Sequence, residues 1–240
     1  EGTVLGYDYL IIATGSRTVP EETPGLKGEL WHKRIFDFYN IEGALALQDF
    51  FKRCEGGNLV VNIAELPFKC PVAPLEFVMY ADAFFTKRGM RNKVNISYVT
   101  PMSGAFTKPR ASKVLGGMLE EKNIHIVPDF YISEVDNAKK TIKDYGGREV
   151  PFDCLVTIPV HMGSEAIIRS GLGDDLGFVP TDPYTLRSKQ FANIFVIGDQ
   201  AHFEDPSGQS LPGLAPVALQ QGRFVADQIR NDQSNKGRQK

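Results

Sequence analysis

The chain has 240 residues, of which 42% are hydrophobic and 23% charged, a balance typical of globular proteins in water. Its formal net charge of −2 provides no electrostatic basis for binding nucleic acid. No apolar run approaches the roughly 20 residues that a helix needs to span a bilayer. The three cysteines are too few for a disulfide framework and indicate a reducing compartment. These features predict a cytoplasmic protein, and they leave peripheral membrane attachment and a homodimer open.

Apolar periodicity predicts alternating strands and helices along the first two thirds of the chain. The expected strands cover residues 4–14, 58–64, 94–99, 124–127, 131–135 and 141–144, and the expected helices cover 41–54, 75–88 and 111–122. Asn40 is the expected N-cap of the first helix. This alternation predicts an α/β fold with a doubly wound parallel sheet.

The same pattern suggests where the domains begin and end. We expect one domain at residues 40–150, inserted into a second that comprises residues 1–39 and 151–230. The second domain would include strands at 154–158 and 194–197 and a closing helix at 211–229. The polar stretch 231–240 is expected to be a disordered tail.

Two strands of similar form each end in a turn of small residues. Tyr7–Ser16 closes on Thr14 and Gly15, and Asn193–Ala201 closes on Gly198 and Asp199. Glycine lets a ligand approach the backbone, and a carboxylate accepts hydrogen bonds from sugar-like hydroxyls. In this order, the motifs resemble the two later FAD-contacting motifs of the pyridine nucleotide–disulfide oxidoreductase superfamily. The resemblance implies a flavoprotein with two dinucleotide-binding domains and makes Thr14, Gly15, Gly198 and Asp199 expected FAD contacts.

One motif of that superfamily is missing. Its members open with a strand, a Gly-x-Gly-x-x-Gly turn and a helix that binds the pyrophosphate, and no such fingerprint occurs here. We therefore expect a shortened chain with a partial FAD domain and an inserted Rossmann-like domain. The 240 residues alone are expected to bind FAD weakly or not at all.

The turn after the strand at 58–64 carries a cysteine where a second glycine fingerprint would bind NAD(P)H. Pro67, Pro71 and Pro74 remove backbone N–H donors from this turn, which argues against a pyrophosphate there. Cys70 lies just before a predicted helix and next to Lys69, and both features favour the nucleophilic thiolate. The alternative is a small buried apolar residue.

The residues around this cysteine point to a particular branch of the superfamily. Phe68-Lys69-Cys70-Pro71, followed by Ala73-Pro74 and Glu76-Phe77, resembles the sulfide:quinone oxidoreductase-like group. The resemblance implies that Cys70 is catalytic and carries sulfur beside the flavin. The group's partner cysteine lies beyond the Gly-Asp motif, and no cysteine follows Asp199 here. Cys154 lies in an apolar strand and is expected in the core, and Cys54 is expected to have no role.

The C-terminal helix provides a second resemblance. Residues 211–223 are similar to the corresponding segment of type II NADH dehydrogenases. This similarity implies that Pro216, Val217 and Ala218 lie against the flavin and that Gln220 and Gln221 line a quinone site. The alternative is a helix with small residues packed on the sheet.

Together these features predict a FAD-dependent oxidoreductase that passes electrons from a sulfide-like compound to a quinone or a similar acceptor. Its partners would be small molecules, and no metal site is expected. Two alternatives remain open at this stage: a type II NAD(P)H:quinone reductase, and a non-catalytic domain or subunit without flavin.

Overall fold

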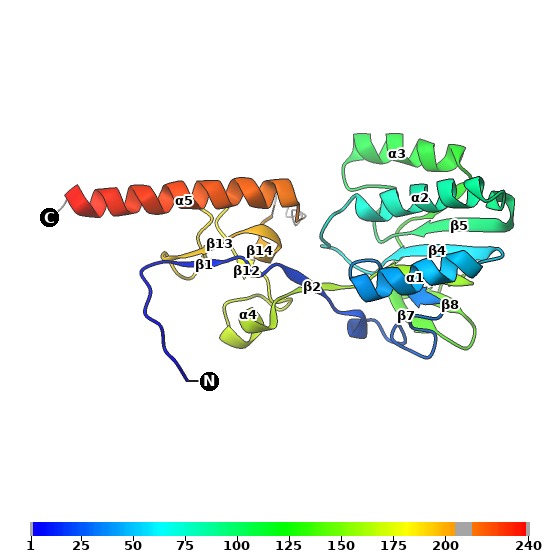
Figure 1. Ribbon diagram of the computed structural model, residues 1–240, viewed down its shortest axis with the longest axis horizontal. Coiled ribbons are helices and arrows are strands. Elements are labelled where there is room, and N and C mark those ends of the chain that lie inside the picture. Colours follow the sequence, from blue (N-terminus) through cyan, green and yellow to red (C-terminus); the bar gives the residue numbers. More distant parts are fainter. Residues whose placement is uncertain (1, 205–212, 239–240) are drawn as a thin grey trace. The chain divides into compact units, whose positions relative to one another are not determined.

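The computed structural model describes residues 2–204 and 213–238, which divide into two compact units (Figure 1). The central unit comprises Thr18–Leu66 and Pro71–Val160. The terminal unit comprises Glu1–Arg17, Pro67–Cys70 and His161–Lys240.

The central unit is built on a five-stranded parallel sheet. Its strands, in spatial order, are β3 (Ile35–Phe36), β10 (Cys154–Ile158), β4 (Gly57–Ile63), β5 (Val94–Val99) and β6 (Ile124–Val127). Residues Leu59–Ile63 of β4 and all of β10 are buried, as expected for continuous apolar strands enclosed on both faces. This arrangement confirms the predicted α/β class.

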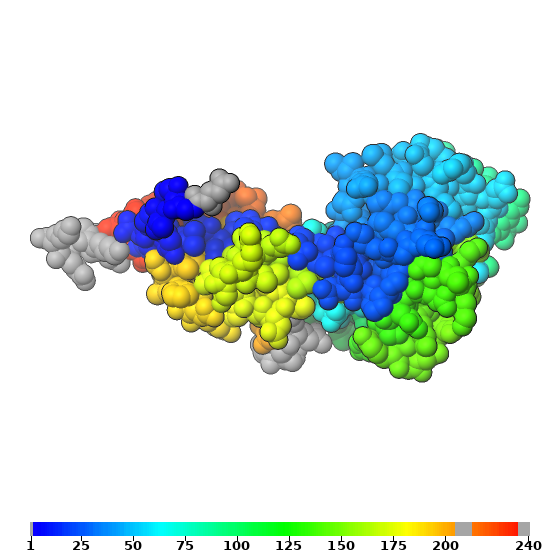
Figure 2. Space-filling view, turned by 90° about the horizontal axis from the view of Figure 1, so that it is seen from below, coloured from blue at the N-terminus to red at the C-terminus, as the bar shows by residue number. Residues whose placement is uncertain are grey.

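Three helices and a small antiparallel sheet complete the central unit. Helix α1 (Ile41–Arg53) packs on β3, α2 (Ala73–Lys87) packs on β4 and β5, and α3 (Pro109–Glu121) packs on β6. The antiparallel sheet contains β7 (Ile132–Asp136), β8 (Thr141–Asp144) and β9 (Glu149–Pro151). In the space-filling view, residues 18–160 form one continuous mass, coloured blue to green (Figure 2).

The ends of these helices are fixed by side chains. Asn40 caps α1 as predicted, because its Oδ1 accepts the N–H of Gly43 at 2.7 Å. Asp82 of α2 accepts hydrogen bonds from Arg91 Nε and Lys122 Nζ, each at 2.7 Å. Burial acts to raise the pKa of Asp82, but its two basic partners outweigh burial and hold the pKa below its usual range. This cluster links α2 to the 3₁₀ turn Arg91–Lys93 and to the end of α3.

The described residues of the terminal unit form three two-stranded sheets and two helices. β1 (Leu10–Ile12) pairs in parallel with β13 (Ile194–Val196), and β12 (Val179–Pro180) pairs in parallel with β14 (Ala201–His202). β2 (Ser16–Thr18), whose last residue already belongs to the central unit, pairs with β11 (His161–Gly163). The helices are α4 (Glu165–Ser170) and α5 (Ala215–Arg238), and a 3₁₀ turn occurs at Gly198–Gln200; the 3₁₀ turn Pro20–Glu22 belongs to the central unit.

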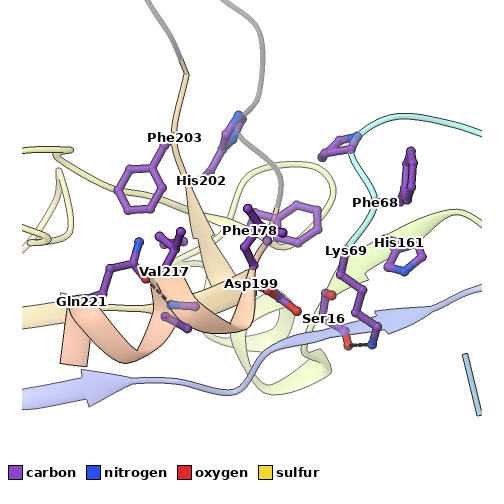
Figure 3. A pocket seen from close by; sticks show the side chains of 16 residues that line it. Ser16, Phe68, Lys69, His161, Phe178, Asp199, His202, Phe203, Val217 and Gln221 are labelled. Carbon is purple, nitrogen blue, oxygen red and sulfur yellow. Dashed lines mark hydrogen bonds between the residues drawn. The ribbon is translucent and has the colours of Figure 1, made fainter. Parts of the chain in front are cut away.

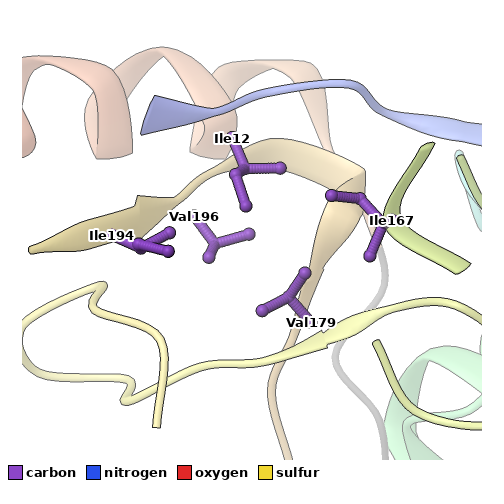
Figure 4. Packing of buried hydrophobic residues seen from close by; sticks show 5 residues of the cluster. All are labelled: Ile12, Ile167, Val179, Ile194 and Val196. Atoms are coloured by element: carbon purple, nitrogen blue, oxygen red, sulfur yellow. The ribbon is translucent and has the colours of Figure 1, made fainter. Parts of the chain in front are cut away.

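The core of the terminal unit forms where β1, β12, β13 and α4 meet. Figure 4 shows the five branched aliphatic side chains of this cluster, namely Ile12, Ile167, Val179, Ile194 and Val196. A second cluster contains Leu186, Phe195 and Val225 of α5. The ends of β1 and β13 are therefore held by packed side chains. None of the helices within residues 2–204 and 213–238 is long and apolar enough to cross a bilayer.

The boundaries of the two units differ from those expected. Cys154–Ile158 was assigned to the flavin domain, yet it pairs with Leu59–Ile63 in the middle of the central sheet. Ile35–Phe36, expected in the first domain part, is the edge strand beyond it. The central unit thus extends over residues 18–160, interrupted at 67–70, rather than over 40–150. A short apolar run predicts a buried strand but does not specify the strand beside it.

The chain end also differs from expectation. Residues 231–238 were predicted to be disordered, but α5 continues through them to Arg238. Asp232 accepts a hydrogen bond from Arg187 at 2.6 Å and another from Tyr9 at 3.4 Å, which anchors this part of the helix. Residues 239–240, and residues 211–212 of the expected helix start, lie outside the described part. Only Leu10–Ile12 of the expected strand at 4–14 forms a strand.

Candidate active site

Three segments that are distant in sequence line one hollow of the terminal unit, which we call the thiol hollow. They are the turn after β1, the turn that carries Cys70, and, from the C-terminal part of the chain, residues 197–199 after β13 together with 213–218 at the start of α5. The lining residues are Ala13, Gly15, Lys69, Cys70, Ile197, Gly198, Asp199, Gly213, Ala215 and Ala218. The hollow thus brings Cys70 together with four of the expected FAD contacts: Gly15, Gly198, Asp199 and Ala218.

Cys70 is exposed and lies on a strained turn. Its φ of 55° falls in the left-handed region, which costs a residue other than glycine about 1–3 kcal/mol. The N–H of Cys70 donates to the carbonyl of Gly213 at 3.1 Å, which fixes the turn against the segment before α5. The buried alternative for this cysteine is therefore wrong.

The other two thiols lie in the central unit. Cys154 is buried in β10, and burial is the main cause that raises the pKa of its thiol well above the usual value. Its predicted place in the core is confirmed. Cys54 is half-buried at the end of α1.

The turn at Gly198-Asp199 forms part of the lining of the thiol hollow. Gly198 has a φ of 67°, and its N–H donates to Oε1 of Gln221 at 2.8 Å. A side chain at Gly213 would collide with the Asp199 carboxylate, so only glycine lets that segment pass so close. The Asp199 carboxylate therefore lies against Gly213, the residue whose carbonyl accepts the N–H of Cys70.

A buried glutamine that the sequence analysis did not identify supports this turn from behind. Oε1 of Gln200 accepts the Thr14 hydroxyl at 2.8 Å and the Ser164 N–H at 3.0 Å. Its Nε2 donates to the carbonyl of Gly177 at 2.6 Å. Thr14, an expected FAD contact, thus uses its hydroxyl to hold Gln200 and does not line the thiol hollow. A buried amide is recognisable only by its partners, which lie 23 to 186 residues away.

A second hollow adjoins the first and shares Lys69, Gly198, Asp199, Gly213 and Ala218 with it. We call it the histidine hollow (Figure 3). Its remaining lining residues are Ser16, Pro67, Phe68, His161, Phe178, Ala201, His202, Phe203, Leu214, Val217 and Gln221. Lys69 reaches across to the carbonyl of Ser16 at 3.1 Å, as the dashed line in Figure 3 shows. Val217, an expected flavin contact, lines this hollow rather than the first.

The two glutamines of α5 have different surroundings. Gln221 is half-buried, and its side-chain oxygen holds Gly198. Gln220 is exposed and lines a third, shallow hollow on α5. The residues around that hollow are Pro183, Tyr184, Leu186, Phe203, Gln220, Gln221 and Phe224. Pro216 lines none of these three hollows.

The polar groups of the two hollows are few and lie among apolar side chains. Within residues 2–204 and 213–238, no three His, Cys, Asp or Glu side chains gather as metal ligands would. The hollows instead combine apolar walls with a few polar groups, an arrangement typical of cofactor and substrate sites.

Comparison with known proteins identifies the class to which this fold corresponds. The chain aligns with the solved sulfide:quinone oxidoreductase of Aquifex aeolicus at a TM-score of 0.80 and 22% identity, covering 98% of this chain and 56% of that one. The molecule therefore has the same α/β fold as that sulfide:quinone oxidoreductase. No protein-family profile matches the chain.

Two curated relatives are similar in sequence. The mitochondrial sulfide:quinone oxidoreductase of Mus musculus is 27% identical over 230 residues, which make up 92% of this chain and 49% of the relative. The alternative NAD(P)H-ubiquinone oxidoreductase C1 of Arabidopsis thaliana is 22% identical over 247 residues, or 93% of this chain and 45% of the relative. The chain thus spans about half the length of these relatives. The resemblance inferred from the Cys70 motif is confirmed.

Proposed function

We propose that this chain forms the sulfur-oxidising half of a FAD-dependent oxidoreductase that passes electrons from a sulfide-like donor to a quinone. The observation that carries the proposal is the position of Cys70, exposed in a hollow that Gly15, Gly198 and Asp199 also line. The similarity to sulfide:quinone oxidoreductases over 92% of the chain supports the same function.

The residues of the thiol hollow fit a flavin. The space around Gly15 is open, because a Cβ added there would have no atom within 4 Å. The Asp199 carboxylate can accept hydrogen bonds from ribityl hydroxyls. The start of α5 lines the hollow through Ala215 and Ala218 and directs its positive end there, which favours negative charge on a bound ring. FAD, when bound, would supply the two-electron acceptor.

Cys70 would provide the nucleophilic sulfur. Joining its Sγ to a sulfide sulfur would form one S–S bond and release two protons to solvent and two electrons, for which a bound FAD would be the acceptor and a quinone the final acceptor. A thiolate from solution then removes the outer sulfur and regenerates Cys70. No second thiol in the described part of the terminal unit could take part, since Cys54 and Cys154 lie in the central unit.

A second candidate is an NAD(P)H:quinone reductase, which the similarity to the Arabidopsis protein favours. The turn after β4 argues against it. Residues 64–76 contain Pro67, Pro71 and Pro74 but no glycine, so this turn lacks the close backbone approach that a pyrophosphate needs.

Anaerobic titration of the FAD-loaded protein distinguishes the candidates. We expect sulfide to bleach the oxidised-flavin absorption band, whereas NADH should leave it unchanged. The C70S variant should lose reduction by sulfide, and C54S, which removes a thiol outside the hollow, should retain it. Sulfide reduction that survives in C70S would refute the role of Cys70. Rapid bleaching by NADH would instead support the second candidate. Failure of the full-length protein, rather than of these 240 residues alone, to take up FAD would support a non-catalytic role.

A further inference from the structure

The histidine hollow contains an imidazole held by a carboxylate. His202, the last residue of β14, lines the hollow, and its Nδ1 lies 2.7 Å from Oδ2 of Asp174. The two side chains are 29% and 25% exposed, so the pair is largely shielded from water. Asp174 does not line the hollow. Asp174 therefore contacts the His202 ring from outside the histidine hollow.

The position of Asp174 is itself fixed by its own loop. Its Oδ1 accepts the N–H groups of Leu176 at 3.0 Å and Phe178 at 2.9 Å. Its backbone N–H donates to the carbonyl of Phe178, and its carbonyl accepts the N–H of Gly177, each at 2.8 Å. An ionised carboxylate only accepts hydrogen bonds, so a hydrogen bond between Oδ2 of an ionised Asp174 and His202 requires the proton on Nδ1. In the neutral ring, Nε2 is then the nitrogen that exchanges protons.

The surroundings of this nitrogen suit an apolar ligand with a polar atom. Phe178, Phe203 and Val217 form apolar walls beside His202 (Figure 3). The charged or titratable side chains that share the hollow are those of Lys69, His161 and Asp199. Outside it, Oε1 of Glu204 lies 3.8 Å from Nε2, and Glu204 is 61% exposed. The histidine hollow also adjoins the proposed flavin site through Gly198 and Asp199.

We propose that His202, oriented by Asp174, is the proton-transfer residue for reduction of the quinone. The inference rests on the proposed function and extends it to the acceptor half-reaction. A quinone needs two electrons, which come from the reduced flavin, and two protons to become a quinol. The imidazolium form of His202 gives one proton from Nε2 to a quinone oxygen, and water supplies the other. Asp174 holds the ring in place and acts as a positioning residue, and His202 regains its proton from solvent.

The ring tautomer provides a test that requires neither flavin nor turnover. The protein has four histidines, so nitrogen-15 spectra of histidine-labelled protein can be assigned with H202Q and H125Q. We expect the neutral His202 ring to be protonated on Nδ1 in the wild type, and D174N to remove that preference. A wild-type ring protonated on Nε2 would overturn the inference.

The kinetic test starts from protein reduced by dithionite, so that it does not depend on the sulfur donor. H202Q should slow reoxidation by a water-soluble quinone by about a hundredfold, the usual contribution of a general acid. Reoxidation by ferricyanide, which takes electrons but no proton, should be unchanged. H125Q, which alters an exposed histidine of the central unit, should behave like the wild type.

The outcomes separate this inference from the proposed function. Unchanged quinone reoxidation in H202Q, or equal slowing with quinone and ferricyanide, would refute proton transfer by His202. Failure of sulfide to reduce the flavin would refute the donor proposal and leave this measurement valid.

Discussion

Replacing Gln200 with alanine removes the side chain that supports the Gly198-Asp199 turn from behind. Gln200 is fully buried, and its amide bonds to Thr14, Ser164 and Gly177. The substitution leaves three polar groups without these partners. Since each hydrogen bond contributes about 1 kcal/mol net, Q200A should lower the free energy of unfolding of the terminal unit by about 3 kcal/mol.

Valine at position 14 provides a matched control. T14V keeps the shape of the side chain but removes only the hydroxyl, so it should cost about 1 kcal/mol. In the double variant, the hydrogen bond between Thr14 and Gln200 is lost only once, although each single variant loses it. The loss in free energy of unfolding of the double variant should therefore be about 1 kcal/mol smaller than the sum of the two single losses.

Amide hydrogen exchange measures these changes locally. A loss of 3 kcal/mol should accelerate exchange of the β1 and β13 amides on the order of a hundredfold in Q200A. The Ser164 amide, which donates directly to Gln200, should respond most strongly. Amides of β4 in the central unit provide the internal reference. Amide exchange in Q200A that is no faster than in T14V would refute the role of Gln200 in joining Thr14, Ser164 and Gly177. Strictly additive losses in free energy of unfolding would refute it as well.

Three further outcomes are expected. A thiol reagent should label Cys70 first and Cys154 only after unfolding, and mass spectrometry of labelled peptides checks the order. The pKa of Asp82 is lower in the folded than in the unfolded state, so its stabilising contribution is complete above about pH 4 and is lost as pH falls through the lower folded value. D82N should therefore lower the free energy of unfolding by about 2 kcal/mol near pH 7 and by progressively less in acid. Urea titrations at several pH values measure this loss. A loss that is constant with pH contradicts the linkage. D232N should weaken the anchor of α5 on Arg187 by about 1 kcal/mol and increase proteolysis near the C-terminus, and unchanged cleavage would argue against the anchor.

Local signals in the sequence predicted much of the fold. The N-cap at Asn40, the apolar runs of β4 and β10, and the alternation of strands and helices are short-range patterns, and the structure confirms all three. The proline-rich turn that carries Cys70 was also recognisable, but only the structure decided that its thiol is exposed rather than buried.

Contacts between distant residues decided the rest. β10 joins the central sheet because its apolar residues pair with those of β4 almost a hundred residues earlier, and that pairing has no local signature. Asp232 extends α5 through a partner 45 residues away. Gln200 and His202 obtain their roles only from Thr14 and Asp174, which the fold brings beside them. The sequence by itself determined the longer helices and the buried strands of the central unit, because those depend on neighbouring residues. The tertiary structure alone decided which strands pair and which side chains share a hollow, because these depend on packing across the whole unit.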